Sequence, residues 1–491
     1  MNSKSDTRCG FSRLLLAALA MLTIAYLLLP LGRIGLRCEL NYNEGWNLYQ
    51  AQRLLDQLPL YPSKTGWTLN NYPAFSFLIS SALHPLTHDL LYTARVLNLL
   101  ALLATAILLG GIGLRLGFSR QASVLTALFA LAVFATSACN YVGVYDPQML
   151  AQSFLVAAIF IYLGDRTSPR NLACALLCFL IGLFIKHNQI DLPLAVLVDL
   201  FLISRRRALC TAAAAVSGAA IIVLLHAHLW GSAFVSLLLG GRLYSRNQMM
   251  TTSLGYGMLL AFPLLVAAHA AWQQGRNRNL RLLVLLLIFS APFCVYFSGG
   301  IGVNVNALFS LFIAMILLNG AFFDRLLRRH PAAECTAAAT IAALFLWLLI
   351  PASFAWQGLN PFAELVRFHQ RQDAFAAEVD FLHQHAGDAI CESMLACALG
   401  GKAFVVDPFN ATRQFETGAL AQQPLLQAID AHRFGVIEMV HLHGEAEMSH
   451  RFTPQMLAAI RHHYRIAKIA GDRMICLPAV GGQESAPACE Q

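Results

Sequence analysis

Long apolar runs recur along this chain of 491 residues, and they constrain its fold more than any other feature. Only 12% of the residues are charged and 57% are hydrophobic, whereas a soluble protein carries about 25% charged residues. A helix satisfies its own backbone hydrogen bonds, so apolar runs of this length cross a bilayer as helices. We therefore predict an α-helical polytopic membrane protein with about eleven transmembrane helices, at residues 14–31, 96–114, 122–138, 148–163, 172–185, 192–203, 208–229, 253–271, 280–297, 305–323 and 337–351.

Two neighbouring runs leave an alternative open. Only residues 186–191 separate the fifth run from the sixth. Both runs are shorter than the roughly 20 residues that a straight span needs. They form either two thin, tilted spans or one re-entrant pair.

Basic residues mark every second loop between the apolar runs. These loops are short, and the positive-inside rule places them in the cytoplasm. The other loops are longer and carry Glu44, Asp146, Lys186 and Arg242, so we expect this unusual chemistry on the outer side. The basic set comprises Arg115, Arg120, Arg166, Arg170, Arg205, Arg206, Arg207, Arg276, Arg278, Arg281, Arg325, Arg328 and Arg329.

The N-terminus has the charge pattern of a signal sequence. Lys4, Arg8 and Arg13 precede the first apolar run, and no small-residue cleavage site follows before Arg33. We interpret the segment as an uncleaved signal anchor with a cytoplasmic N-terminus, in the inner (plasma) membrane. The net charge of +8 resides in these small clusters, which are topology determinants rather than a nucleic-acid groove.

The composition changes after Pro351. An odd number of spans places the rest of the chain on the outer side, so we predict a transmembrane domain at 1–352 and an extracytoplasmic α/β domain at 353–480. Its expected helices are 364–384, 424–431 and 454–464, and its expected strands are 403–406 and 434–440. Gly471 and Asp472 indicate a hairpin between 465–470 and 474–477. We expect a disordered tail at 481–491.

The first outer loop combines an acid with aromatic and amide side chains. Glu44 lies between Asn43 and Trp46, and Tyr72 is located further along the loop. Residues 46–58 have the pattern of an amphipathic helix lying in the membrane interface. Glu44 either caps or solvates that helix, or it belongs to a sugar-binding site, since such polar and aromatic clusters stack on and bond to sugars.

Two further outer loops contain candidate residues. Asp146 precedes a proline that can open a helix, so it is either an N-cap or a carboxylate presented to substrate or metal. Lys186 and His187 come directly after an apolar run. A cation there is costly unless it snorkels or meets an anion, which is either Asp191 or a lipid phosphate.

Arg242 and Arg246 are similar candidates for phosphate contacts, although the outer loops of any membrane protein can hold two arginines. The 12 cysteines are scattered without metal-site spacing, and we expect most to be buried. Cys391 and Cys397 are placed to pair on an oxidising face. Histidines near the C-terminus (His441, His443, His450, His462 and His463) lack a metal motif, so we interpret them as solvated surface.

Taken together, these motifs resemble the GT-C superfamily of polytopic glycosyltransferases, which use a polyprenyl-phosphate-linked sugar and include aminoarabinose and protein O-mannosyltransferases. Many members have Asp or Asp-Glu where this chain has Asn43-Glu44, so the acid is present at, or one residue beside, the family position. The motifs are Asn43-Glu44-Gly45-Trp46, Leu60-Tyr61-Pro62, Asn71-Tyr72-Pro73, Tyr145-Asp146-Pro147, Lys186-His187-Asn188-Gln189 and the glycine-rich 299–306.

The resemblance implies a mechanism. Glu44 would take the proton from an acceptor hydroxyl, and Asp146 would orient the acceptor or hold a metal. Lys186, Arg242 and Arg246, or a bound divalent metal, would meet the leaving phosphate. His187 is a further candidate for substrate binding. Asn43, Trp46 and Tyr72 would contact substrate. The implied partners are a lipid-linked donor, a glycan, lipid or protein acceptor, and membrane lipids.

Two other functional classes remain as alternatives. A transporter or flippase of a lipid-linked sugar needs ionisable residues in the middle of its spans. The main candidates, Asp199 and His226, lie near the ends of predicted spans. A non-catalytic scaffold accounts for an outer domain but not for the grouping of Glu44, Asp146 and Lys186.

Overall fold

The computed structural model describes residues 3–61, 66–231, 233–238, 243–274, 277–328, 334–355, 358–440, 451–479 and 489. The chain divides into two compact units. The helical unit comprises Met1–Ile34, Arg95–Ile222 and Tyr244–Glu364, and the mixed unit comprises Gly35–Ala94, Val223–Leu243 and Leu365–Gln491. Contacts thus group residues 35–94 with the C-terminal residues, whereas composition alone suggests a division at 352–353.

Every predicted apolar run is helical in the structure. The run 253–271 breaks into α11 and α12, which are bent by 83°. Among the described residues, six helices are long and apolar enough to cross a membrane, or seven with the bent pair as one span, so the count of about eleven stays a prediction. The helices are α1 (Ser3–Gly32), α4 (Leu90–Arg115), α5 (Arg120–Ser137), α6 (Gln148–Tyr162), α7 (Pro169–Ile185), α8 (Asp191–Ile203), α9 (Arg205–Trp230), α11 (Arg246–Leu259), α12 (Ala261–Gln274), α13 (Arg281–Phe297), α14 (Phe309–Leu327), α15 (Glu334–Trp347) and α16 (Leu349–Ala355).

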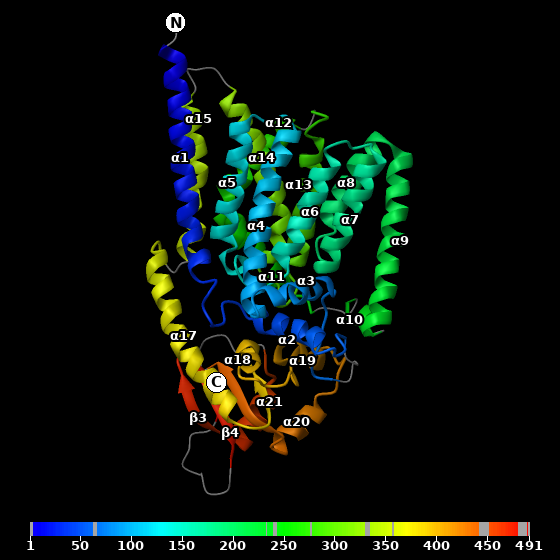
Figure 1. Cartoon of the computed structure of the whole chain (residues 1–491), viewed down its shortest axis with the longest axis vertical. Helices are drawn as coiled ribbons and strands as arrows, with labels where there is room; N and C mark the ends of the chain where they lie inside the picture. The colour runs from blue at the N-terminus through cyan, green and yellow to red at the C-terminus, as the bar shows by residue number, and fades with distance from the viewer. Residues whose placement is uncertain are drawn as a thin grey trace. The chain divides into compact units, whose positions relative to one another are not determined.

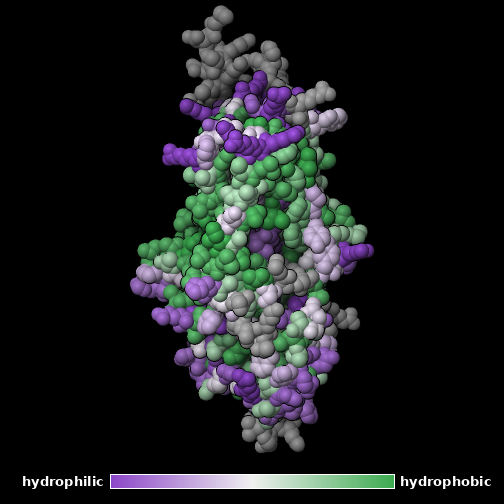
Figure 2. All heavy atoms as spheres, turned by 90° about the vertical axis from the view of Figure 1, so that its right-hand side faces the viewer, coloured by the Kyte–Doolittle hydropathy of each residue, from purple (hydrophilic) through white to green (hydrophobic). Residues whose placement is uncertain are grey.

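Helix α14 forms the core of the helical unit. It packs against α5, α12 and α13, and its aromatic side chains interlock with those of α5. Phe134 meets Phe309 edge-on at 5.0 Å between ring centroids, and Phe129 meets Phe323 at 5.7 Å. At the periphery, α9 exposes Leu209, Val216 and Leu224, and Figure 2, viewed from the side of α9, shows a largely hydrophobic surface there. A helix that exposes apolar side chains in this way is suited to contact lipid.

The described residues of the loops that the sequence groups as basic lie at one end of the helical unit (Figure 1). Asp199, at the end of α8, accepts hydrogen bonds from Tyr162 at 2.7 Å and Arg166 at 3.1 Å, and it pairs with Arg281 at 2.8 Å. Arg328 donates to the carbonyl of Gly117 at 2.6 Å. This arrangement agrees with the predicted alternation of loops, and Asp199 lies at the basic end of a helix, as expected.

The mixed unit holds a four-stranded sheet with the order β1-β2-β4-β3. Strand β1 (Asp388–Cys391) is parallel to β2 (Phe434–Val440), and β4 (Arg473–Pro478) is antiparallel to both β2 and β3 (Tyr464–Ala470). Gly471, with φ +62°, forms the predicted turn between β3 and β4. The helices are α2 (Asn43–Leu55), α3 (Phe75–Leu83), η1 (His84–Leu86), α10 (Ala233–Leu238), α17 (Pro361–Gln384), α18 (Met394–Leu399), α19 (Pro408–Glu416), α20 (Gln423–Asp430) and α21 (Pro454–His463).

These elements confirm three expected helices (α17, α20 and α21), one strand (β2) and the hairpin. The predicted strand at 403–406 is wrong, because these residues form no strand pairing. Their apolar side chains pack elsewhere: the Phe404 ring stacks on Tyr49 at 4.6 Å. Of the predicted tail, only Cys489 is described; it forms a disulfide with Cys476. His441, His443 and His450 lie outside the described residues.

Candidate active site

Glu44 lies in the first turn of α2 and is fully buried. Its Oε2 accepts a hydrogen bond from the backbone N–H of Leu40 at 2.9 Å, while its own N–H donates to the carbonyl of Asn41 at 3.0 Å. The N-terminal end of a helix stabilises a carboxylate electrostatically. Glu44 therefore does fix the turn that precedes α2, as its structural interpretation predicts, but its side chain is not solvated.

The predicted polar and aromatic neighbours of Glu44 gather in the mixed unit. The Asn43 carbonyl accepts a hydrogen bond from the Asn47 side chain at 2.8 Å. Trp46 donates from its indole to the carbonyl of Leu69 at 3.2 Å, and its ring meets Tyr72 edge-on at 4.8 Å. Because Trp46 is buried and Tyr72 is half-buried, Tyr72 is the more accessible ring.

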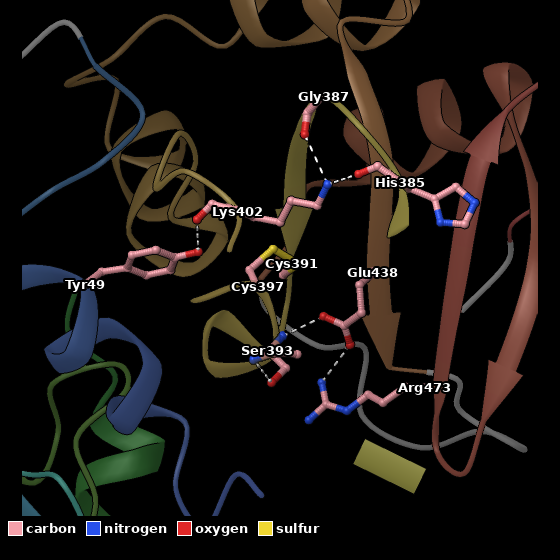
Figure 3. Close-up of a disulfide and its surroundings, with 10 residues drawn as sticks. Tyr49, His385, Gly387, Cys391, Ser393, Cys397, Lys402, Glu438 and Arg473 are labelled. Carbon is pink, nitrogen blue, oxygen red and sulfur yellow. Dashed lines mark hydrogen bonds and ion pairs between the residues drawn. A yellow bond between two sulfur atoms is a disulfide. The ribbon is translucent and has the colours of Figure 1, made fainter. Parts of the chain in front are cut away.

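Helix α2 rests directly on α18. A Cβ atom added to Gly45 would lie 2.1 Å from the backbone nitrogen of Leu395, a distance that no side chain tolerates. A disulfide joins Cys391 to Cys397 across the turn that begins α18, as Figure 3 shows. Glycine at position 45 therefore allows the turn that carries Glu44 to contact the C-terminal residues.

Buried ion pairs hold the segment before α2 against the sheet. Arg473, on β4, pairs with Glu39 at 3.0 Å and with Glu438 at 3.2 Å. The second oxygen of Glu438 accepts from the backbone N–H of Ser393 at 2.7 Å (Figure 3). A buried charge is tolerated only when it is paired and hydrogen-bonded. Arg473 thereby links residue 39 to two strands of the sheet.

A second arginine repeats this arrangement. Arg451 pairs with the buried Glu392 at 3.2 Å, and its guanidinium lies 3.9 Å from the centroid of the Tyr42 ring. Sequence reasoning missed these residues. The available signal was Glu438, a charge within the apolar strand Phe434–Val440, because a strand buried on both faces should not hold a lone carboxylate.

Burial also changes the acidity of Asp407. This side chain caps α19, accepting from the backbone N–H of Asn410 at 3.1 Å. Burial, the largest effect, raises the pKa of Asp407 to about 6 from 3.8, although the bonds from Asn410 oppose the rise. Burial likewise raises the pKa of Glu438, against the opposing charge of Arg473.

We expect Asp407→Asn to reduce the loss of stability as pH rises. A raised pKa means that the folded state binds the proton on Asp407 more tightly than the unfolded state does. Proton binding therefore stabilises the fold fully below pH 3.8, and this stabilisation is lost as pH passes about 6. The pKa difference between the folded and unfolded states corresponds to at most about 3 kcal/mol in the free energy of unfolding. Asn keeps the cap and cannot ionise. Thermal unfolding between pH 4 and pH 8 measures the effect, and an unchanged pH profile would contradict it.

Asp146 lies in the helical unit, two residues before the first residue of α6. Its Oδ1 accepts from the backbone N–H of Gln148 at 2.8 Å. Asn98 fixes the same loop by donating to the Asp146 carbonyl at 3.1 Å and accepting from Gly143 N–H at 2.8 Å. Asp146 therefore bonds the first residue of α6, although the N-cap residue is Pro147, and the carboxylate remains a candidate for a second role.

The cationic candidates also lie in the helical unit. Lys186 comes directly after the last residue of α7, where the helix dipole favours a cation, and its side chain is buried. His187 comes next, and Asp191 accepts a hydrogen bond from Ser310 at 3.1 Å. Arg246 begins α11 and is exposed, whereas Arg242 lies outside the described residues.

The structure therefore brings the candidates together as two groups. Glu44, Asn43, Trp46 and Tyr72 share the mixed unit, and Asp146, Lys186, His187 and Arg246 belong to the helical unit. That both groups serve one substrate stays a prediction. Among the described residues, no group of three or more His, Cys, Asp or Glu side chains is arranged to hold a metal ion.

Solved structures of other proteins share this fold. No protein-family model matches the chain, and no curated protein matches it in sequence. ArnT from Cupriavidus metallidurans, solved with bound undecaprenyl phosphate, has a TM-score of 0.60 at 12% identity, covering 96% of this chain and 98% of its own. The archaeal oligosaccharyltransferase AglB from Archaeoglobus fulgidus, in complex with an inhibitory peptide and a dolichol-phosphate, has a TM-score of 0.54 at 10% identity, covering 88% and 70%.

Both proteins belong to the GT-C superfamily. The chain has the GT-C fold over nearly its whole length, as the sequence motifs predict.

Proposed function

We propose that this protein is a membrane glycosyltransferase that moves a sugar from a polyprenyl-phosphate donor to an acceptor hydroxyl. The observation that carries the proposal is the fold shared with ArnT over 96% of the chain, since ArnT was solved with a polyprenyl phosphate bound. Glu44 supports it as a buried carboxylate in the first turn of α2, two residues before the buried Trp46. The transferred sugar is a hexose or a pentose.

The proposed chemistry is a single displacement. Glu44 removes the proton from the acceptor hydroxyl, whose oxygen forms a bond to the anomeric carbon. The bond from that carbon to the donor phosphate breaks, and the phosphate leaves with the electron pair. Lys186, Arg242 and Arg246 stabilise the leaving charge. Asp146 orients the acceptor.

Reaction on the outer side of the membrane completes the proposal. Both disulfides of the described chain lie in the mixed unit, and disulfides persist in oxidising compartments. The basic loops gather at one end of the helical unit, as the positive-inside rule expects of a cytoplasmic end. These observations favour an outer mixed unit in the inner (plasma) membrane.

Replacing Lys186 by Met tests the donor site. The variant removes a charge from the proposed phosphate contact, so we expect polyprenyl phosphate to bind roughly 10- to 100-fold more weakly, the usual effect of losing a hydrogen bond to a charged group. Titration of the purified full chain in detergent with polyprenyl phosphate measures this change.

Arg205→Met is the matched control. Arg205 is exposed at the basic end of the helical unit, and its loss should leave binding unchanged. Equal affinity of the Lys186→Met and wild-type proteins would remove Lys186 from the donor site.

A further inference from the structure

A cavity of about 620 Å³ lies within the mixed unit, beside the C-terminal half of α2. Its size falls in the range of about 300–1,000 Å³ that is typical of small-molecule sites. Arg53 borders it and lies nine residues after Glu44, which corresponds to about 13 Å along a helix. Leu48 also lines the cavity and lies one helical turn after Glu44, so the cavity extends along α2 from a point close to the candidate base.

The floor of the cavity is apolar and aromatic. Leu48, Leu90 and Leu91 line it and are buried. Tyr49 and Phe404 add a pair of stacked rings, and the Tyr49 hydroxyl is fixed by donating to the carbonyl of Lys402 at 2.9 Å. This rigid surface suits the C–H faces of a ring-shaped ligand.

The rim of the cavity provides both donors and acceptors. Gln52 donates to Asp56 at 2.8 Å, and Arg53 uses its Nε to bond the carbonyl of Pro59 at 2.9 Å. Within the described chain, the buried Nδ1 of His84 has no hydrogen-bond partner. A buried polar atom of this kind costs free energy unless a ligand or water satisfies it.

Charges of both signs line the cavity: Arg37, Arg53 and Lys402 with Asp56 and Asp89. Arg37 pairs with Asp89 at 2.8 Å. The Lys402 ammonium is directed to the backbone carbonyls of His385 and Gly387 (Figure 3). An anion would face Asp56 and Asp89, and a cation would face the arginines. A neutral ligand rich in hydroxyl groups, which both donate and accept, avoids either conflict.

We infer that this cavity binds the sugar rings of a neutral oligosaccharide acceptor. The inference rests on the proposed function and adds the acceptor class. Leu48 and Gln52 come after Glu44 at intervals of four residues, so they continue one face of α2 from the candidate base into the cavity. An acceptor whose reacting hydroxyl lies at Glu44 extends its remaining rings along this face.

Binding to the full-length protein in nanodiscs tests the inference without requiring transfer. The probes are short neutral oligosaccharides of glucose, galactose and mannose, with uronic-acid oligosaccharides and glycerol phosphate as anionic comparisons. We expect saturation-transfer NMR to detect a neutral oligosaccharide. Gln52→Ala and Asp56→Ala, at exposed rim positions, should each weaken its binding by about 3- to 10-fold, the effect of one hydrogen bond.

The controls separate this site from the catalytic proposal. Asp472→Asn changes a carboxyl with 83% exposure that is not part of the cavity lining, and this variant should bind normally. Binding of anionic probes alone, of no oligosaccharide, or of one unaffected by both rim variants would overturn the inference even if sugar transfer is observed. Rim-dependent binding in a protein without transfer activity would support the cavity and contradict the proposed function.

Discussion

Glu44→Gln should lower sugar transfer by roughly 10²–10⁴-fold, the usual contribution of a general base. Gln is isosteric with Glu and keeps an oxygen that can accept the Leu40 N–H, which lies 2.9 Å from the carboxylate. The turn before α2 should therefore persist while proton removal is lost. Turnover and thermal unfolding of the purified variant measure the two effects separately.

Asp472→Asn controls for the loss of a carboxylate in the same unit. Its side chain is 83% exposed in the turn between β3 and β4, and transfer should be unchanged. A Glu44→Gln protein with the wild-type rate would exclude Glu44 as the base and leave the fold assignment intact.

Gly45→Ala should both destabilise the protein and reduce transfer. The new Cβ would meet the Leu395 backbone nitrogen at 2.1 Å, and backbone cannot rotate away as a side chain can. Overpacking of this kind costs about 1–3 kcal/mol or more. Separation of α2 from α18 also moves Glu44, and a shift of about 1 Å in a reacting group can cost roughly 10²-fold in rate.

Gly35→Ala is the matched substitution. No atom lies within 4 Å of a Cβ at that position, so unfolding temperature and transfer should match the wild type. If Gly45→Ala behaved like Gly35→Ala, the close contact between α2 and α18 would not exist in the protein.

Much of the helical unit can be predicted from the sequence because lipid imposes a simple rule. A segment in hydrocarbon must be apolar and must bond its own backbone, so each apolar run becomes a helix. The run 253–271 differs from the prediction of a single span because it is not straight. Apolar residues continue on both sides of Leu260, and composition does not report the 83° bend between α11 and α12.

The mixed unit is harder to predict because its defining contacts join distant residues. Arg473 and Glu39 form an ion pair across 434 positions, and nothing local to either residue indicates the other. The motif around Glu44 marks the turn that begins α2, but it does not indicate the contact between α2 and α18. The wrong strand prediction at 403–406 has a similar origin. The apolar side chain of Phe404 stacks on Tyr49, a residue distant in sequence, and does not belong to a strand.

Asp146 illustrates what a local motif can establish. Asp directly before Pro predicts a capped helix start, and Asp146 does accept from Gln148 at 2.8 Å. A cap and a catalytic role are compatible, since each uses a different oxygen lone pair. Whether Asp146 acts on the same substrate as Glu44 depends on residues of both units, which no local pattern specifies.

The most direct measurement uses the full-length protein in liposomes that contain a polyprenyl-phosphate sugar with radiolabel in the sugar. A panel of labelled hexose and pentose donors is incubated with oligosaccharide, lipid and peptide acceptors. The account predicts that label moves from lipid to acceptor, with one polyprenyl phosphate released per sugar and with loss of both products in Glu44→Gln. Movement of intact labelled lipid between leaflets, with no cleavage of the sugar–phosphate bond for any donor, would contradict it and identify a transporter.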